Sequence, residues 1–71
     1  MARQKTLSNR QQQVIDLAAQ GLTIFAMARQ LNISPRTVES HLARARHRLS
    51  AQNTTHAVAL YLSQERSVTN G

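Results

Sequence analysis

The 71-residue sequence has no cysteine, no tryptophan, a single proline and only two glycines. Without cysteine the protein can form neither a disulfide framework nor a thiolate metal site, so its fold must rest on an apolar core alone. No apolar run approaches the length that spans a bilayer, and the polar N-terminus lacks the apolar segment of a signal peptide. We therefore expect a soluble protein that stays in the cytoplasm.

Acidic residues are also scarce. Three Asp and Glu stand against nine Lys and Arg, which gives a net charge of +6. Such a charge suggests a partner rich in phosphate, and nucleic acid is the first candidate. A membrane surface also attracts cations, but Arg44, Arg46 and Arg48 are not opposed by bulky aromatic side chains. Phe25 and Tyr61 are the only aromatic residues, so we expect no membrane binding.

Groups for catalysis are missing as well. The three histidines are spread over residues 41–56, Asp16 is the single aspartate, and no Gly-rich phosphate loop is present. Neither a zinc site nor a Ser-His-Asp arrangement has its parts at a plausible spacing. We expect no enzymatic activity, no metal and no cofactor.

Hydroxyl residues mark the starts of three predicted helices. Ser8, Thr23 and Ser34 can each accept a backbone N–H that a helix N-terminus leaves unpaired. Gln11 completes a capping box with Ser8, and Pro35 occupies the first helical position after Ser34, where its missing N–H costs nothing. This pattern predicts an all-α protein of four helices. The expected segments are a basic arm at 1–6, a helix from Ser8 that Gly21 ends, a short helix after Thr23, a turn at 32–33, a helix from Ser34, a last helix from near Asn53 or Thr54 to about Gln64, and a frayed end at 67–71.

The helix that begins at Ser34 has two different faces. Small side chains at the centre of its outer face would allow the backbone close to base edges in a DNA major groove, while basic side chains at the margins reach phosphates. An ordinary solvent-exposed helix that happens to be Arg-rich is the alternative. Val38, Leu42, Ala45 and Leu49 recur at helical spacing and must face a core. The opposite face carries Arg36, Ser40, Ala43 and His47, with Glu39 and Arg46 on one side and Thr37, Arg44 and Arg48 on the other.

Only about three residues separate this helix from the short helix before it. Two capped helices at that spacing are typical of a helix-turn-helix, in which the first helix crosses the DNA backbone and the second lies in the groove. A plain helical hairpin has the same short connection, so the spacing alone leaves both open.

Four segments together carry a family resemblance: LSNR at 7–10 with Val14 after it, LAAQGLT at 17–23, MARQLNISPRTVESHL at 27–42 and THAVA at 55–59. They resemble the LuxR-type, GerE-like DNA-binding domain of bacterial transcription regulators over about residues 7–62. The resemblance implies a small four-helix domain with a helix-turn-helix, of the winged-helix-like LuxR C-terminal type, at residues 7–66, followed by a flexible tail at 67–71. It also implies sequence-specific binding to double-stranded DNA as a homodimer at inverted repeats near promoters. The protein would then be cytoplasmic and would associate with the nucleoid when bound.

The same resemblance assigns DNA contacts to particular positions. It implies that Glu39, Ser40 and Ala43 approach bases. Glu39 is the one acidic group on this face; it can accept a hydrogen bond from a cytosine amino group, or it can pair within the helix with Arg36 three residues before it. Contacts with phosphate are implied for Thr23, Arg36, Thr37, His41, Arg44, Arg46 and Arg48.

The last predicted helix has more apolar surface than one core face needs. Ala57, Leu60 and Tyr61 form one stripe, and Val58 with Leu62 forms another. One stripe can pack on the domain and the other on a second copy, with Val58, Leu60 and Leu62 as candidate dimer residues. A two-fold dimer would address half-sites about 10 base pairs apart. A wide core-facing stripe on a monomer is the alternative.

The chain departs from the family pattern at three places. Ile24-Phe25-Ala26 replaces a polar turn of the Asn-Lys-Glu kind, so Ile24 and Phe25 mark either a contact with a protein partner or a contact with the N-terminal arm. Glutamines at 11–13 replace common acidic residues, which favours DNA binding. Ser50 and Ala51 stand where a glycine is usual, so a left-handed conformation at Ser50 would carry strain.

Two other interpretations stay open. The chain can be a protein-interaction module that modulates another regulator or RNA polymerase through Ile24, Phe25 and the last helix. The segment ARAR at 43–46 also resembles the promoter-reading helix of a sigma factor, although the apolar last helix favours the LuxR type. If the chain is complete, as Met1 suggests, it has no room for a receiver or ligand-binding domain, and its activity would follow its concentration, its dimerisation or a partner. If the chain is a fragment, this expectation does not hold.

Overall fold

The computed structural model describes the backbone of residues 7–70 and the side chains of residues 7–63. The helices are α1 (Asn9–Ala19), α2 (Ile24–Leu31), α3 (Pro35–Arg48) and α4 (Thr54–Asn70), and the described residues contain no strand. This confirms the predicted all-α class and the number of helices. The predicted basic arm at 1–6 lies outside the described residues.

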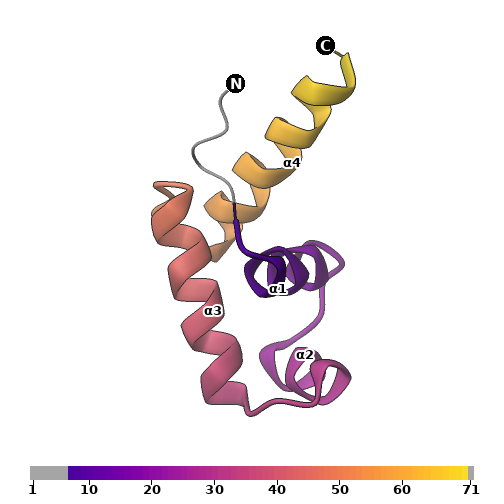
Figure 1. The fold of residues 1–71 in the computed structure, drawn as a ribbon, viewed down its shortest axis with the longest axis vertical. Coiled ribbons are helices and arrows are strands. Elements are labelled where there is room, and N and C mark those ends of the chain that lie inside the picture. The colour runs from indigo at the N-terminus through magenta and orange to yellow at the C-terminus, as the bar shows by residue number, and fades with distance from the viewer. Residues whose placement is uncertain (1–6, 71) are drawn as a thin grey trace.

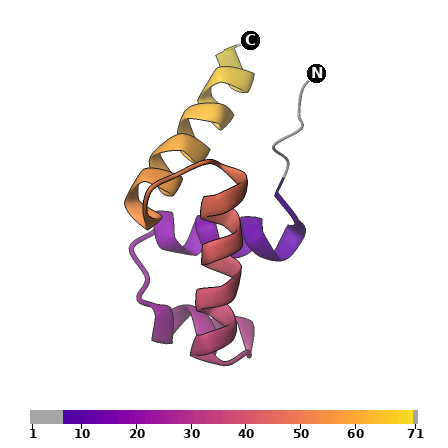
Figure 2. The same ribbon diagram turned by 90° about the vertical axis from the view of Figure 1, so that its left-hand side faces the viewer.

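Helix α3 runs along one side of the molecule and contacts each of the other three helices (Figure 1). Helix α2 packs near the end where α3 begins, and α4 follows the end where α3 finishes (Figure 2). Helix α1 lies between them and also contacts the other three. Because α2 and α4 share no contact among the described residues, α1 and α3 are the helices that hold the domain together.

The predicted caps at the helix starts are confirmed. The Gln11 backbone N–H donates to Ser8 Oγ at 3.1 Å, and the Ser8 N–H donates to Gln11 Oε1 at 3.1 Å, which completes the capping box. Thr23 Oγ1 accepts from the Ala26 N–H at 3.1 Å at the start of α2. Ser34 Oγ accepts from the Thr37 N–H at 3.1 Å at the start of α3. Each cap contributes about 1 kcal/mol to stability.

The ends of α1, α2 and α3 share one motif. In each, a residue just past the helix has positive φ, and the N–H of the next residue donates to a carbonyl five positions earlier, as in a Schellman cap. The positive-φ residues are Gly21 (φ 91°), Asn32 (φ 59°) and Ser50 (φ 57°). Ser50 therefore adopts the left-handed conformation whose strain the sequence suggested. The closing bonds are Leu22 N–H to Leu17 O, Ile33 N–H to Ala28 O and Ala51 N–H to Arg46 O, at 3.1, 3.0 and 2.8 Å.

Helix α4 begins where the sequence predicted and continues further. Asn53 Oδ1 accepts from the His56 N–H at 2.8 Å, and the Gln52 N–H donates to His56 Nδ1 at 3.1 Å. The helical backbone then continues to Asn70, past the end predicted near Gln64. Residues 63–70 contain neither glycine nor proline, the residues that usually end helices. The flexibility of the tail at 67–71 stays a prediction, and Gly71 lies outside the described residues.

The core is formed by all four helices together with Leu7 and Leu49 beside them. Every position of the helix from Ser34 that the sequence predicted to face the core is buried. Truncating a buried aliphatic side chain such as Ile15 to alanine typically costs about 2–5 kcal/mol. The buried apolar residues are Leu7, Val14, Ile15, Leu17, Met27, Ala28, Val38, Leu42, Ala45, Leu49, Ala57 and Tyr61.

Candidate nucleic-acid interface

The outer face of α3 is a continuous exposed surface. Core packing fixes this orientation, because the opposite stripe, which includes Val38 and Ala45, is fully buried. Ser40 and Ala43, the two smallest residues of this face, are both exposed. We call this surface the α3 outer face; its exposed members are Arg36, Glu39, Ser40, Ala43, Arg44, His47 and Arg48.

Three predicted contact residues lie at the margins of this face rather than on it. Thr37, His41 and Arg46 are each half-buried. The Thr37 hydroxyl lies 2.8 Å from the Ser34 hydroxyl, so it takes part in the start of α3. Arg46 lies on the opposite edge of the helix from Arg44, because two helical positions rotate a side chain by roughly 200°. Basic residues therefore flank the small centre on both sides.

Thr23, the remaining predicted phosphate contact, comes from a different helix. It is exposed at the N-cap of α2, and its hydroxyl already accepts the Ala26 N–H. The structure therefore places it at the start of the first helix of the helix-turn-helix, as the sequence pattern implied, with its side chain serving the cap.

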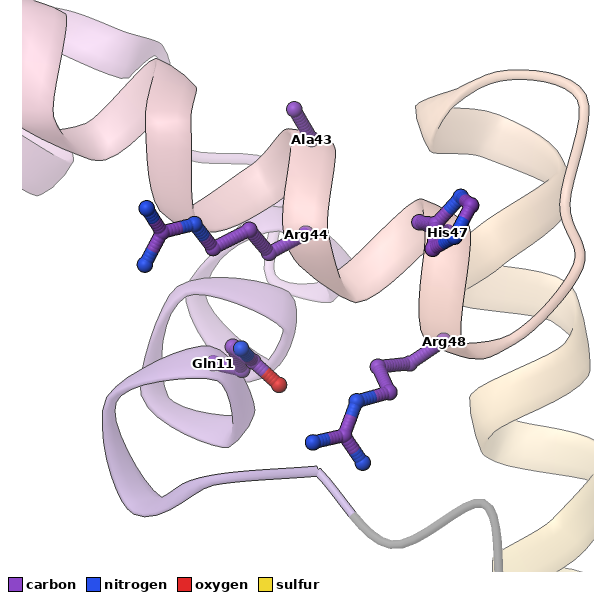
Figure 3. Close-up of a pocket in the computed structure, with 5 residues that line it drawn as sticks. All are labelled: Gln11, Ala43, Arg44, His47 and Arg48. Atoms are coloured by element: carbon purple, nitrogen blue, oxygen red, sulfur yellow. The ribbon is translucent and has the colours of Figure 1, made fainter.

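A surface depression of about 390 Å³ lies between the beginning of α1 and the second half of α3. Figure 3 shows Arg44 and Arg48 extending from α3 toward α1, with Gln11 of α1 between them. Ala43 and His47 complete the lining from α3. The sequence predicted a capping role for Gln11, where glutamine replaces a common acidic residue, but it did not place Gln11 beside α3. Its place beside α3 depends on how α1 and α3 pack, and no local pattern in the sequence carries that information.

Positive charges from both α1 and α3 lie near His41. Burial lowers the pKa of His41 below its usual value of 6.5, and the positive charges of Arg10 on α1 and Arg44 on α3 lower it further. The positive charges of two helices, Arg10 on α1 and Arg44 on α3, therefore both act on the His41 imidazole. The five residues that line the depression include no Asp or Glu.

Among residues 7–63, two large apolar side chains are exposed, and both lie outside α3. Phe25, near the start of α2, is 71% exposed, while its neighbour Ile24 is half-buried against the core. Leu62 of α4 is 41% exposed. The sequence alternative in which Phe25 folds onto the N-terminal arm concerns residues outside the described range.

The structure separates the two apolar stripes of α4. Ala57 and Tyr61 are buried in the core, and Leu60 packs against the core at its edge. Val58 is half-buried without joining that core set, and Leu62 is exposed. The stripe of Ala57, Leu60 and Tyr61 therefore faces the domain, and Val58 and Leu62 face outward.

The described residues contain no group of three or more His, Cys, Asp or Glu side chains placed to bind a metal ion. Within the same part of the chain, no helix combines the length and the apolar character needed to cross a membrane.

Comparison with known proteins gives one family and two relatives. The family model GerE, for bacterial regulatory proteins of the luxR family, matches residues 5–61. The chain is 46% identical over 54 residues to the transcriptional activator protein BjaR1 of Bradyrhizobium diazoefficiens, a match that covers 76% of this chain and 22% of that protein. It is 40% identical over 62 residues to the transcriptional regulatory protein FixJ of Rhizobium meliloti, covering 87% of this chain and 30% of that protein. The chain thus spans less than a third of the length of either relative.

Proposed function

Because this chain belongs to the LuxR family of bacterial regulatory proteins, a family of DNA-binding transcription regulators, we propose that it binds specific DNA sequences through α3 and thereby regulates transcription. The α3 outer face is the observation that carries the proposal. It is one side of a 14-residue helix, with a small centre and basic edges. Such a helix fits the major groove of B-DNA, which is wide enough to admit it. We further place the protein in the cytoplasm, on the nucleoid when bound.

The contacts divide by position on the helix. Glu39, Ser40 and Ala43 approach base edges, where a carboxylate can accept from the amino group of cytosine. The residues at the margins contact phosphates, which fix the position of the helix but carry no sequence information. These phosphate-contacting residues are Thr23, Arg36, Thr37, His41, Arg44, Arg46 and Arg48.

We also propose that two copies bind together. Val58 and Leu62 on the outward side of α4, with Leu60 at its edge, form the contact between them, because apolar side chains on an otherwise polar helix surface favour a second copy. A two-fold dimer presents its two α3 helices to an inverted repeat. The half-sites would lie about 10 base pairs apart, one turn of the DNA helix.

The experiment that tests this function is selection of bound duplexes from a random DNA pool, with the selected duplexes measured again at two salt concentrations. We expect an enriched inverted repeat whose binding weakens with salt, since each DNA phosphate that the protein neutralises contributes roughly 0.9 to the salt slope. Salt-sensitive binding without an enriched motif would contradict sequence-specific regulation. Enrichment of a single half-site would contradict the proposed dimer but not sequence-specific DNA binding.

The exposure of Phe25 favours a second candidate function. In it the chain acts on another regulator or on RNA polymerase through Ile24, Phe25 and the last helix. Phe25→Asp should then lower regulation in transcription from a defined template with purified polymerase, at unchanged DNA affinity. Gln30→Asp, at an exposed position of the same helix, is the matched control. Equal regulation by both variants would reject this function.

A further inference from the structure

The depression between α1 and α3 has the composition of an anion site. Two of its five lining residues, Arg44 and Arg48, are permanently cationic, and none is acidic. Guanidinium groups bind phosphate oxygens through paired N–H donors in a fixed geometry. Gln11 adds a side chain that is only 8% exposed, so its amide is held in place while it lines the depression (Figure 3).

The amide of Gln11 is not explained by the capping box. Its Oε1 atom accepts the Ser8 N–H, and a glutamate at this position would accept the same bond. A glutamate in the first helical turn would also gain from the positive end of the helix dipole. Glutamine lacks this favourable interaction with the helix dipole. It still forms the capping box, and it places no negative charge between Arg44 and Arg48. Its Nε2 atom adds a donor.

We propose that the depression is a phosphate-binding site in which Arg44, Arg48 and the Gln11 amide bind one phosphate group. The inference rests on the proposed function, because it assigns this phosphate to the DNA backbone beside the groove that holds α3. Ala43 and His47 belong to both the α3 outer face and the lining of the depression. A DNA strand at the edge of that face therefore passes over the depression. Helix α1 thus becomes a third DNA-contacting element.

The test compares Gln11→Glu with Gln12→Glu. Both variants lower the net charge by one near the start of α1, and Glu can serve the capping box at position 11, but Gln12 is exposed and does not line the depression. With the selected duplex, we expect Gln11→Glu to weaken binding about tenfold and to lower the salt slope by about 1, the loss of one phosphate contact. Gln12→Glu should bind within about twofold of the wild type.

Thermal unfolding of both variants checks that the fold is intact. If Gln11→Glu unfolds at a lower temperature than Gln12→Glu, the affinities of both variants are compared at a temperature well below both midpoints, where both are folded, and the same tenfold loss is expected. Equal affinities in the matched pair would overturn the phosphate site while leaving the proposed function in place. Failure of the wild type to bind any duplex would instead contradict the proposed function.

A second measurement identifies the source of the phosphate. A duplex with single methylphosphonate replacements removes one backbone charge at a time. At one position the wild type should lose affinity, whereas Gln11→Glu should lose less, because its contact is already broken. Inorganic phosphate is titrated in parallel against chloride at equal ionic strength. Saturable phosphate binding that competes with DNA and disappears in Gln11→Glu would support the site with free phosphate as its ligand. Absence of both effects would overturn it.

Discussion

Helices α3 and α4 both bury one apolar stripe, but they expose opposite kinds of surface. Beyond its stripe, α3 exposes small, polar and basic side chains, including Arg36, Ser40 and Ala43. Helix α4 exposes or half-exposes the apolar Val58 and Leu62. A polar basic surface matches a hydrated, charged polymer, whereas an apolar surface is stabilised by contact with another protein surface. The contrast supports the proposal that α3 binds DNA and that α4 binds a second copy, and each part of the proposal can be tested without disturbing the other.

The largest expected effect is at the centre of the α3 outer face. Ala43→Glu places a carboxylate where the proposed function brings α3 closest to the DNA, so we expect specific affinity to fall by more than about a hundredfold. Fluorescence anisotropy with the selected duplex measures it. Ala19→Glu, at an exposed alanine of α1, should retain binding. Comparable losses in both variants would show that net charge, not the position on α3, decides binding.

The matching change on α4 is Val58→Asp combined with Leu62→Asp. Charges on the outward stripe should separate the dimer, which sedimentation equilibrium would report. Affinity for the inverted repeat should fall by about 10–100-fold, since the second half-site no longer binds intramolecularly. Affinity for an isolated half-site should not change. If that affinity fell as well, α4 would contribute to DNA binding itself, and the contrast between the helices would fail.

A smaller effect concerns the starts of the two helices. Ser34→Ala removes the hydroxyl that caps α3, and Asn53→Ala removes the carbonyl oxygen that accepts the His56 N–H at the start of α4. Each should cost about 1 kcal/mol, or about 4–8 °C in the unfolding midpoint of a domain of this size. Ser40→Ala, an exposed serine inside α3, is the control and should leave the midpoint nearly unchanged. DNA affinity should respond more to Ser34→Ala, because the proposed function places α3, and not α4, in the groove.

The smallest expected effect is a pH dependence at His41. Its folded-state pKa is lowered by burial and by Arg10 and Arg44, so the unfolded chain binds this proton more readily than the folded one. The contribution of His41 to stability is therefore complete above the unfolded pKa, about 6.5, and is lost as the pH falls toward the lowered folded pKa. If His41 contacts phosphate as proposed, the DNA favours the charged imidazole, so DNA affinity should rise as the pH falls through the same range.

The variant His41→Gln tests both predictions, the loss of stability and the rise in DNA affinity as the pH falls. Unfolding midpoints and DNA affinities are measured from about pH 8 to about pH 5, where histidine changes its charge. The variant should lose less stability on acidification than the wild type and gain less affinity. Parallel curves for the two proteins in both measurements would exclude His41 as the group responsible.

Local chemistry made most of the fold predictable. Caps such as Ser8 with Gln11, and the left-handed position at Ser50, depend on neighbouring residues in the chain, so they could be predicted from it. Two features depended on packing between helices. Leu60 packs against the core, and only the structure shows which side of α4 faces that core. Gln11 lies beside the α3 residues of the depression only because α1 packs against α3.

The candidate DNA-contacting residues were predicted from the pattern of α3 and from the family resemblance. At the centre of the α3 outer face, Ser40 and Ala43 are exposed, as the pattern predicted. The half-burial of Thr37 and Arg46 could not be predicted from helical spacing alone, because it depends on how far neighbouring segments cover the edges of α3. Their roles toward DNA stay predictions.

The Schellman caps at the ends of α1, α2 and α3 have a kinetic consequence. Residues 20–23, 32–34 and 49–53 connect the helices, so most of the domain can form from segments that are close along the chain. Short loops lose little entropy on closure, and helical proteins dominated by local contacts fold in microseconds to milliseconds. A molecule whose Ser34–Pro35 bond keeps its native isomer should therefore refold far faster than the seconds to minutes that proline isomerisation requires. A molecule that opens transiently can regain its DNA-binding surface almost at once.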